Sequence, residues 1–187
     1  MKNATPNIRN AEATAERILR AAQTVFHEKG YDGATTREIA DRAGINLTLI
    51  NRYYGSKLGL FEKAVLPHLN LQPLLQGTPA EVARRLAELY VDTGPKDGFD
   101  AFVVLVRSIA SREAGPLLIA RLQEAALTPL ERILEGPDKG ARATLIATQL
   151  AGLVLRFRIM AEIPLSEEER RELKRRLEAS LHAILLR

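Results

Sequence analysis

Residues 35–57 read TTREIADRAGINLTLINRYYGSK, and this stretch decides the fold. Thr35 and Glu38 have the spacing of a capping box. In this motif the threonine hydroxyl accepts a hydrogen bond from a backbone N–H of the first turn, and the glutamate carboxylate accepts one from the backbone N–H of the cap residue. The buried stripe of a short helix follows, made of Ile39, Ala40 and Ala43. We therefore expect a helix that begins at this cap.

Gly44 stands where the chain must reverse, because glycine adopts a positive φ at little steric cost. Asn46 can cap a second helix, whose buried face carries side chains four residues apart, Ile50 and Tyr54. Thr48 and Arg52 fall on the opposite face. Two short helices, one turn and one polar face predict a helix-turn-helix motif.

The segment from Ala15 to Val65 resembles the DNA-binding domain of the TetR family of transcriptional regulators. A first helix is predicted by apolar side chains at helical spacing: Ile18, Leu19, Ala22, Val25 and Phe26. Gly30 is well placed to end that helix. The later motifs of the resemblance are I-A-x-x-A-G-I at 39–45, Y-Y-G-S-K at 53–57, and Leu60-Phe61, which opens a fourth helix.

Composition narrows the classes of function. Hydrophobic residues make up 46% of the 187, which is enough for a globular core. The net charge of +4 permits binding to nucleic acid. Without cysteine there is no disulfide or thiolate site, and no catalytic or cofactor motif is present, so we expect neither a metal nor a cofactor. No export segment or membrane span is visible, which predicts a cytoplasmic protein.

No segment alternates polar and apolar residues as a strand would, so an all-α fold is expected. Residues 1–12 are predicted to be a mobile arm, in which Lys2 and Arg9 are either solvated or follow phosphates. We expect a helix-turn-helix DNA-binding domain at 13–66 and a helical bundle for effector binding and dimerisation at 67–187. Within the bundle we predict helices over 79–94, 99–115, 116–135 with a break at Pro129, and 139–163. A capping box of Ser166 and Glu169 is expected to open a last helix that runs to about residue 186.

The resemblance implies two roles at the DNA. Contacts to the bases are assigned to Leu47, Thr48 and Arg52, and contacts to phosphates to Thr35, Thr36, Arg37, Tyr53 and Lys57. Arg52 could pair with guanine or hold a phosphate, whereas Tyr54 is expected in the core. Asn51 stands where many relatives carry tyrosine, and its amide could instead read adenine.

The resemblance also implies a homodimer whose interface is a four-helix bundle, formed by residues 141–163 and 168–186 of each copy. The predicted interface residues are Ala147, Leu150, Ala151, Leu153, Val154 and Leu177. The alternative is that these side chains pack only within one subunit. We favour the dimer because one subunit alone would leave much apolar surface exposed.

A pocket for a small effector is implied between the middle helices. Its candidate residues are Tyr90, Phe102, Leu105, Val106, Leu122, Arg156, Phe157 and Met160, although most could equally be ordinary core. Arg107 and Arg156 lie in apolar sequence and need partners. Arg156 could bind an acidic ligand or pair with Glu113, Glu124 or Glu162. The composition favours an apolar or aromatic effector with at most one anionic group.

The leading hypothesis is a dimeric repressor that leaves a pseudo-palindromic operator on double-stranded DNA when a small molecule binds. A constitutive regulator or an activator without an effector is the first alternative. An all-α enzyme is the second, and it is disfavoured because the three histidines are widely separated and the common catalytic motifs are missing.

Overall fold

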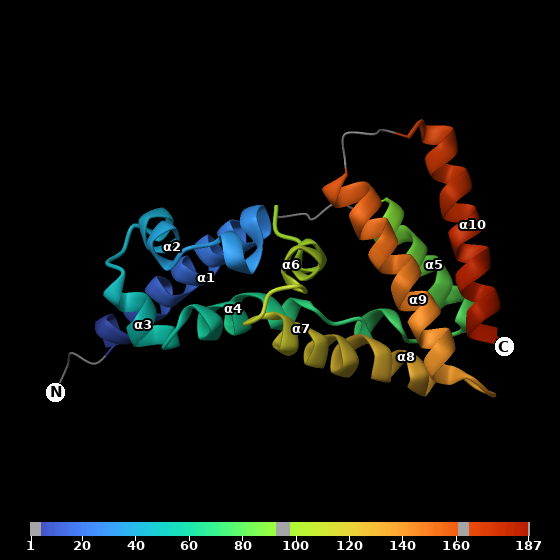
Figure 1. Ribbon diagram of the computed structural model, residues 1–187, viewed down its shortest axis with the longest axis horizontal. Coiled ribbons are helices and arrows are strands. Elements are labelled where there is room, and N and C mark those ends of the chain that lie inside the picture. The colour runs from blue at the N-terminus through green and yellow to red at the C-terminus, as the bar shows by residue number, and fades with distance from the viewer. Residues whose placement is uncertain (1–4, 93–97, 161–164, 187) are drawn as a thin grey trace.

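The computed structural model describes residues 5–92, 98–160 and 165–186, with side chains from residue 11 onward, and this part of the chain contains helices and no strand. Helices α1 to α4 gather at one end of an elongated molecule, and α5, α9 and α10 lie at the other (Figure 1). Helices α6 and α7 lie between these groups. The α-helices are α1 (Thr5–Gly33), α2 (Thr36–Ala43), α3 (Thr48–Tyr54), α4 (Lys57–Val65), α5 (Pro79–Val91), α6 (Ala101–Ser108), α7 (Gly115–Leu122), α8 (Thr128–Ile133), α9 (Lys139–Val154) and α10 (Glu167–Leu186).

The first core lies under α1, α2, α3 and α4. The apolar stripe of α1 is fully buried there, as predicted: Ile18, Ala22, Val25 and Phe26. The ring of Phe26 meets that of Phe61 edge-on at 4.9 Å, an arrangement that aromatic pairs favour. Gly30 has φ 68°, so the helical geometry of α1 is interrupted at the predicted residue.

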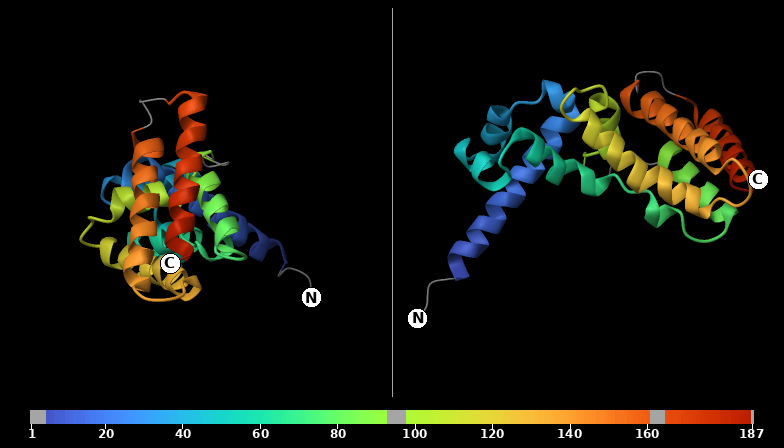
Figure 2. Two further views of the ribbon diagram at one scale, coloured as in Figure 1. Left: turned by 90° about the vertical axis from the view of Figure 1, so that its right-hand side faces the viewer. Right: turned by 60° about the horizontal axis from the view of Figure 1, so that its bottom comes forward.

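Helix α1 begins earlier than the sequence suggested. Residues 5–12 were expected in an arm without regular structure, but α1 starts at Thr5 and its N-terminal part projects from the domain (Figure 2). The physical reason is local, since proline is well tolerated in the first turn of a helix and Pro6 occupies that position. Lys2 lies outside the described residues, as does the side chain of Arg9.

The caps of the motif are confirmed with one correction. The backbone N–H of Glu38 donates to the Thr35 hydroxyl at 3.2 Å. The Glu38 carboxylate, however, pairs with Lys29 at 2.8 Å rather than returning to the cap, because the end of α1 offers it a cation. Gly44 adopts φ 63°, and Asn46 Oδ1 accepts from the N–H of Thr48 at 2.9 Å.

The second core lies between α5, α9 and α10. It contains Leu86, Ile146, Leu150 and Leu181, each at most 2% exposed. The predicted capping box of Ser166 and Glu169 opens α10, and the sequence reading missed a second box, formed by Thr78 and Glu81 at the start of α5. Pro129 breaks its helix as predicted: η3 (Gln123–Leu127), a π-helical turn, precedes α8.

Helix α9 is shorter than predicted. An α-helix was expected over 139–163, but α9 ends at Val154 and continues as η4 (Leu155–Ile159), a second π-helical turn. Residues 161–164 lie outside the described part of the chain. Within the single subunit, Leu145 and Leu155 of this helical run are 54% and 44% exposed.

The segment after α4 forms two short 3-10 turns, η1 (Leu66–His68) and η2 (Gln72–Leu74). Helices α6 and α7 then contribute Val104 and Leu118 to the first core. Phe102 packs against both cores. Helix α6 therefore contacts both halves of the molecule.

Candidate DNA interface and internal cavity

The residues predicted to contact DNA occupy α2, α3 and their flanks. Of the nine, Thr36 and Lys57 are partly buried, and exposed positions are held by Thr35, Arg37, Leu47, Thr48, Asn51, Arg52 and Tyr53. Helix α3 carries Arg52 and no acidic residue. Neither Arg37 nor Arg52 makes an ion pair within the described residues. This surface is therefore polar, basic and open.

Two ion pairs fix α2 on the end of α1. Glu28 pairs with Arg42 at 2.9 Å, and Lys29 pairs with Glu38 at 2.8 Å. The hydrogen bond from Arg42 holds the pKa of the Glu28 carboxyl below its usual value. These pairs engage Glu28 and Glu38, and α3 carries no acidic residue of its own, so Arg52 is open to an external partner.

Asn46 shapes the start of α3. Its Oδ1 accepts from both the N–H and the hydroxyl of Thr48, the latter at 2.8 Å. The Thr48 hydroxyl therefore has its proton engaged, while its lone pairs and methyl group remain exposed.

Tyr54 and Lys57 have internal contacts. Tyr54 is partly buried and donates its hydroxyl hydrogen to the carbonyl of Ala15 at 3.0 Å, which confirms its expected place in the core. Burial raises the pKa of the Tyr54 hydroxyl. Lys57 Nζ lies 4.2 Å from the centre of the Tyr31 ring, a cation–π contact that holds the amine beside the motif.

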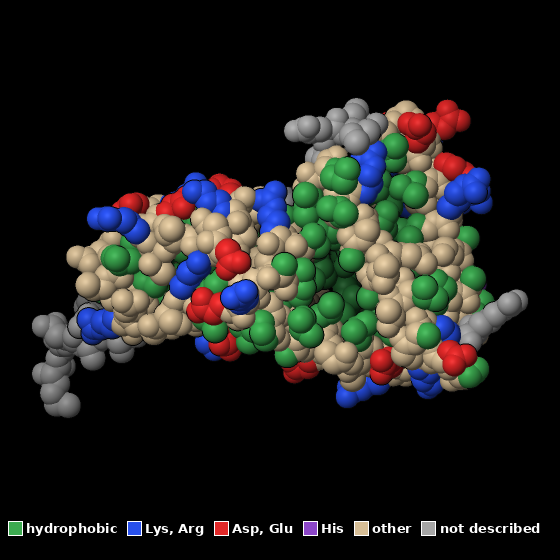
Figure 3. Space-filling model, in the orientation of Figure 1, with side chains coloured by type: hydrophobic (Ala, Val, Ile, Leu, Met, Phe, Trp, Pro, Cys, Tyr) green, Lys and Arg blue, Asp and Glu red, His purple; other side chains and the backbone are tan. Residues whose placement is uncertain are grey.

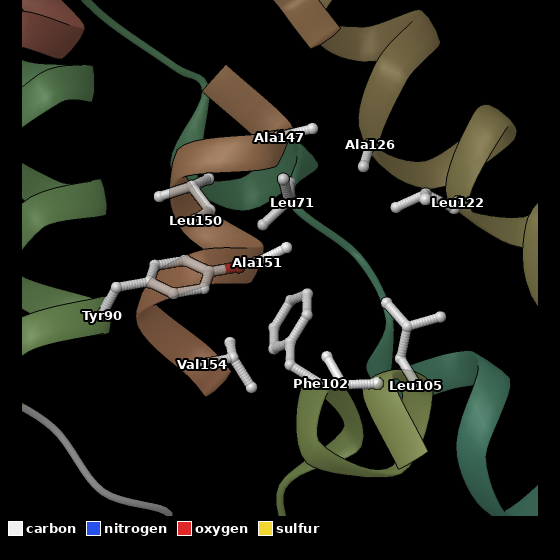
Figure 4. A pocket seen from close by; sticks show the side chains of 11 residues that line it. Leu71, Tyr90, Phe102, Leu105, Leu122, Ala126, Ala147, Leu150, Ala151 and Val154 are labelled. Atoms are coloured by element: carbon white, nitrogen blue, oxygen red, sulfur yellow. The ribbon is translucent and has the colours of Figure 1, made fainter. Parts of the chain in front are cut away.

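A cavity of about 70 Å³ lies between α6, α7 and α9. Figure 3 shows hydrophobic side chains gathered around a hollow in this region, and Figure 4 shows the lining in detail. The lining residues are Leu71, Tyr90, Phe102, Leu105, Val106, Leu122, Ala126, Ala147, Leu150, Ala151 and Val154. Tyr90 supplies the one polar side-chain group of this lining, and burial raises the pKa of its hydroxyl.

Five of the eight predicted pocket residues line this cavity: Tyr90, Phe102, Leu105, Val106 and Leu122. Arg156 and Phe157 instead line an open groove between η4 and α10, and Met160 is 47% exposed. The reason is η4, since a π-helical turn shifts the side chains after Val154 away from the face that an α-helix would give them.

The two arginines singled out in the sequence lie in different surroundings. Arg156 shares its groove with carboxylates of α10 and contacts the face of Phe157 at 5.2 Å; it forms no ion pair with Glu113 or Glu124. Glu162 lies outside the described residues. Arg107 donates to the backbone carbonyls of His27 and Glu28, so its partners are the end of α1 and not a carboxylate.

Four of the predicted interface residues belong to the cavity instead: Ala147, Leu150, Ala151 and Val154. Leu150, Val154 and Leu177 are at most 7% exposed, so they pack within the subunit and cannot present their side chains to a partner. Leu153 lines the groove beside α10. The exposed face of α9 includes Ala151, the one predicted interface residue of these four that is exposed, together with Thr144, Leu145, Thr148, Gly152 and, one residue beyond the helix, Leu155.

The sequence reading also missed a buried ion pair. Arg158 pairs with Asp100, which caps α6 by accepting from the N–H of Phe102 at 2.9 Å. Arg158 also donates to the carbonyl of Leu89 at 2.7 Å. An Asp directly before the apolar run of α6 was the available signal, because aspartate is a preferred helix cap.

Within the described ranges, no group of three or more His, Asp or Glu side chains could hold a metal ion. None of the helices in those ranges is long and apolar enough to cross a membrane.

Two family models match most of the chain. Residues 18–64 match the model of bacterial regulatory proteins of the tetR family, and residues 80–185 match that of the tetracyclin repressor-like C-terminal domain. The chain belongs to the TetR family. The first TetR-family match covers the domain that carries the helix-turn-helix motif, and the second covers the helical bundle with its cavity.

The curated relatives of this TetR-family chain are regulators. The chain is 32% identical over 59 residues to the HTH-type transcriptional repressor BdcR of Escherichia coli K12 and 34% identical over 77 residues to the uncharacterised regulator YvkB of Bacillus subtilis. These alignments cover 32% and 41% of this chain, and 30% and 41% of the relatives. A transcriptional activator, FasR of Mycolicibacterium smegmatis, also matches, with 38% identity over 53 residues, 28% of this chain and 24% of FasR.

Solved structures match over nearly the whole chain. NalD of Pseudomonas aeruginosa, the secondary repressor of a multidrug efflux pump, has a TM-score of 0.70 at 17% identity, over 95% of this chain and 98% of its own. The regulator CifR, in a complex with 26-bp operator DNA, has a TM-score of 0.68 at 22% identity, and the match covers 90% of this chain and 95% of the CifR chain. At these identities the likeness shows that the fold is shared.

Proposed function

We propose that this TetR-family chain is a sequence-specific DNA-binding transcriptional regulator. It binds a pseudo-palindromic operator as a homodimer in the cytoplasm, represses the adjoining promoter and leaves the DNA when a small molecule fills the cavity. The observation that carries this proposal is the α2–Gly44–α3 motif with its exposed basic face and no competing ion pair at Arg37 or Arg52 among the described residues.

The roles at the DNA follow from the chemistry of each side chain. Arg52 reads guanine through O6 and N7, and Thr48 offers its lone pairs and methyl group. Asn51 can pair with adenine, and Leu47 can make only apolar contact. Phosphates are held by Thr35, Thr36, Arg37, Tyr53 and Lys57. The structure of CifR with operator DNA supports this assignment by analogy of fold.

A dimer is supported by the limited reach of one motif and by the exposed face of α9. A seven-residue recognition helix contacts too few bases for tight selection, and two copies on half-sites one DNA turn apart remove that limit. Leu145 and Leu155 give α9 an apolar exposed face with Ala151 and Gly152 between them, so a partner helix can approach closely.

The cavity favours a neutral, apolar effector that carries one hydrogen-bonding group. Its lining offers no charge, and the Tyr90 hydroxyl is available as the single polar contact. An anionic ligand would lose its hydration without compensation there. The expectation allowed at most one anionic group, and the cavity favours none, because Arg156 lies in the other groove. The cavity also favours an effector-responsive regulator over a constitutive one.

The test compares a base-contact variant with a phosphate-contact variant on an operator selected from random duplexes. Arg52→Met should relax the preference at one base pair by about 1–3 kcal/mol. Lys57→Met should weaken binding to every sequence and lower the salt dependence by about one released counterion. Arg132→Met, an exposed change on α8, is the matched control and should alter neither. If Arg52→Met weakens all sequences equally, Arg52 holds a phosphate; if no sequence is enriched, the proposed function is wrong.

A further inference from the structure

The DNA-reading domain contacts the rest of the molecule through the C-terminal ends of α1 and α4. The last carbonyls of an α-helix lack partners within that helix and carry the negative end of its dipole. In this chain each of the two ends receives an arginine from the other half of the molecule: Arg107 from α6 and Arg121 from α7.

Arg107 holds the end of α1. Its Nη1 donates to the carbonyl of His27 at 2.7 Å and also to that of Glu28. Beside it, the N–H of Tyr31 donates to the Ser108 hydroxyl at 2.9 Å. Gly30 permits this close approach, since a Cβ there would lie 3.1 Å from the carbonyl oxygen of Arg107.

Arg121 holds the end of α4. Its Nε donates to the carbonyl of Leu66, the residue that ends α4, at 3.1 Å. The Arg121 side chain is 24% exposed and also reaches Glu124 at 3.5 Å, although Glu124 is largely in solvent. Gln23 links the two ends, because its side chain on α1 donates to the carbonyl of Ala64 on α4 at 3.1 Å.

Both arginines stand next to the cavity in sequence. Val106 precedes Arg107 and Leu122 follows Arg121, and these two apolar residues line the cavity. At about 70 Å³ the cavity is smaller than the roughly 150 Å³ that suffices for benzene. A larger occupant must therefore displace some of the lining elements. Two of these, α6 and α7, each carry a guanidinium that holds one DNA-domain helix.

We propose that Arg107 and Arg121 are positioning residues that fix the DNA-reading domain on the bundle, and so determine which half-site spacing the dimer accepts. Neither touches DNA. The proposal rests on the proposed function, since it needs a dimer on two half-sites, and it goes beyond it by assigning the geometry of the readout to two named backbone contacts. Guanidinium is suited to this role because it stays charged at all physiological pH values.

The experiment measures dissociation constants, at fixed salt, for a selected operator and for copies with half-site spacing changed by one and two base pairs. The wild-type protein should prefer its own spacing by about tenfold or more, because half-site separation mirrors the separation of the reading helices. Arg107→Met and Arg121→Met should bind a single half-site as the wild type does, yet discriminate between spacings by less than about threefold. Arg107→Lys, which keeps the charge but not the forked donors, should fall between.

Glu124→Gln and Arg132→Met are the controls, since they remove the exposed ion pair and an arginine unrelated to the junction. Both should keep the wild-type spacing preference. A merely structural role would lower affinity for all spacings together and leave their ratios intact, and that result would overturn the proposal. Failure of the wild type to select any operator would instead overturn the proposed function.

Discussion

Arg142 shows how a buried charge can be satisfied by backbone alone. It is 8% exposed and lies on α9, and its guanidinium donates to the carbonyls of Ile184 and Leu185 at the end of α10. It also reaches the carbonyls of Glu135 and Pro137 in the turn before α9. One side chain thus ties the start of α9 and the turn before it to the end of α10.

Replacing Arg142 with Met should lower the free energy of unfolding by about 2–3 kcal/mol, because hydrogen bonds from a charged group are lost and buried carbonyls remain without donors. Urea denaturation at one protein concentration measures this. Arg132→Met, on exposed α8, should change it by less than about 0.5 kcal/mol. Equal effects from the two substitutions would contradict this role for Arg142.

At the scale of single residues, the sequence correctly predicted contacts between groups that lie close together in the chain. Thr35, Gly44, Asn46 and Ser166 are close to the groups they cap, so spacing alone located those contacts. Arginines with distant partners were different. The partners of Arg107 lie about eighty positions earlier in the chain, and only the tertiary fold brings them together.

At the scale of elements, the π-helical turns explain most of the errors. Helical periodicity placed Phe157 and Met160 in line with Val154, but η4 interrupts that register. The cavity residues of α9 that were assigned to the dimer interface precede η4, so a different reason applies to them: small and apolar side chains suit an internal cavity as well as a partner helix. The motif domain was predicted almost completely because its helices are short, capped and uninterrupted, whereas the bundle required knowledge of where the helical register changes.

Filling the cavity from α9 tests whether it receives the effector. Ala147→Leu adds three carbon atoms beside Leu122 and Ala126 and should leave stability within about 1.5 kcal/mol, since the space is already present. With the wild-type protein, millimolar p-cresol should raise Tm more than toluene does, and benzoate should not raise it. Ala147→Leu should abolish both increases, and Tyr90→Phe should remove the advantage of p-cresol.

Equal shifts from benzoate and p-cresol would contradict the neutral character inferred for the site. Shifts that persist in Ala147→Leu would place the bound probe elsewhere, and the groove of Arg156 and Phe157 would then be the next site to test.

For the whole molecule, the exposed face of α9 is the dimer interface that we propose. Leu155→Glu places a charge at an apolar position that is 44% exposed in the single subunit. This variant should be a folded monomer, because the centre of a protein interface is depleted of charged residues, whereas its rim tolerates them. Ile119→Glu, at a 58% exposed position on α7, is the control and should stay dimeric. Sedimentation velocity distinguishes the two, and a dimeric Leu155→Glu would place the interface on another face.

The central claim is that this chain recognises a particular DNA sequence through α3. The most direct measurement is the ratio of dissociation constants for a selected operator and a scrambled duplex of equal length at physiological salt. We predict a ratio of about 10³ or more, typical of specific protein–DNA complexes, and a pseudo-palindrome whose half-site centres lie about 10–10.5 bp apart or at a multiple of that distance. A ratio near one, with binding that depends only on salt, would contradict the account.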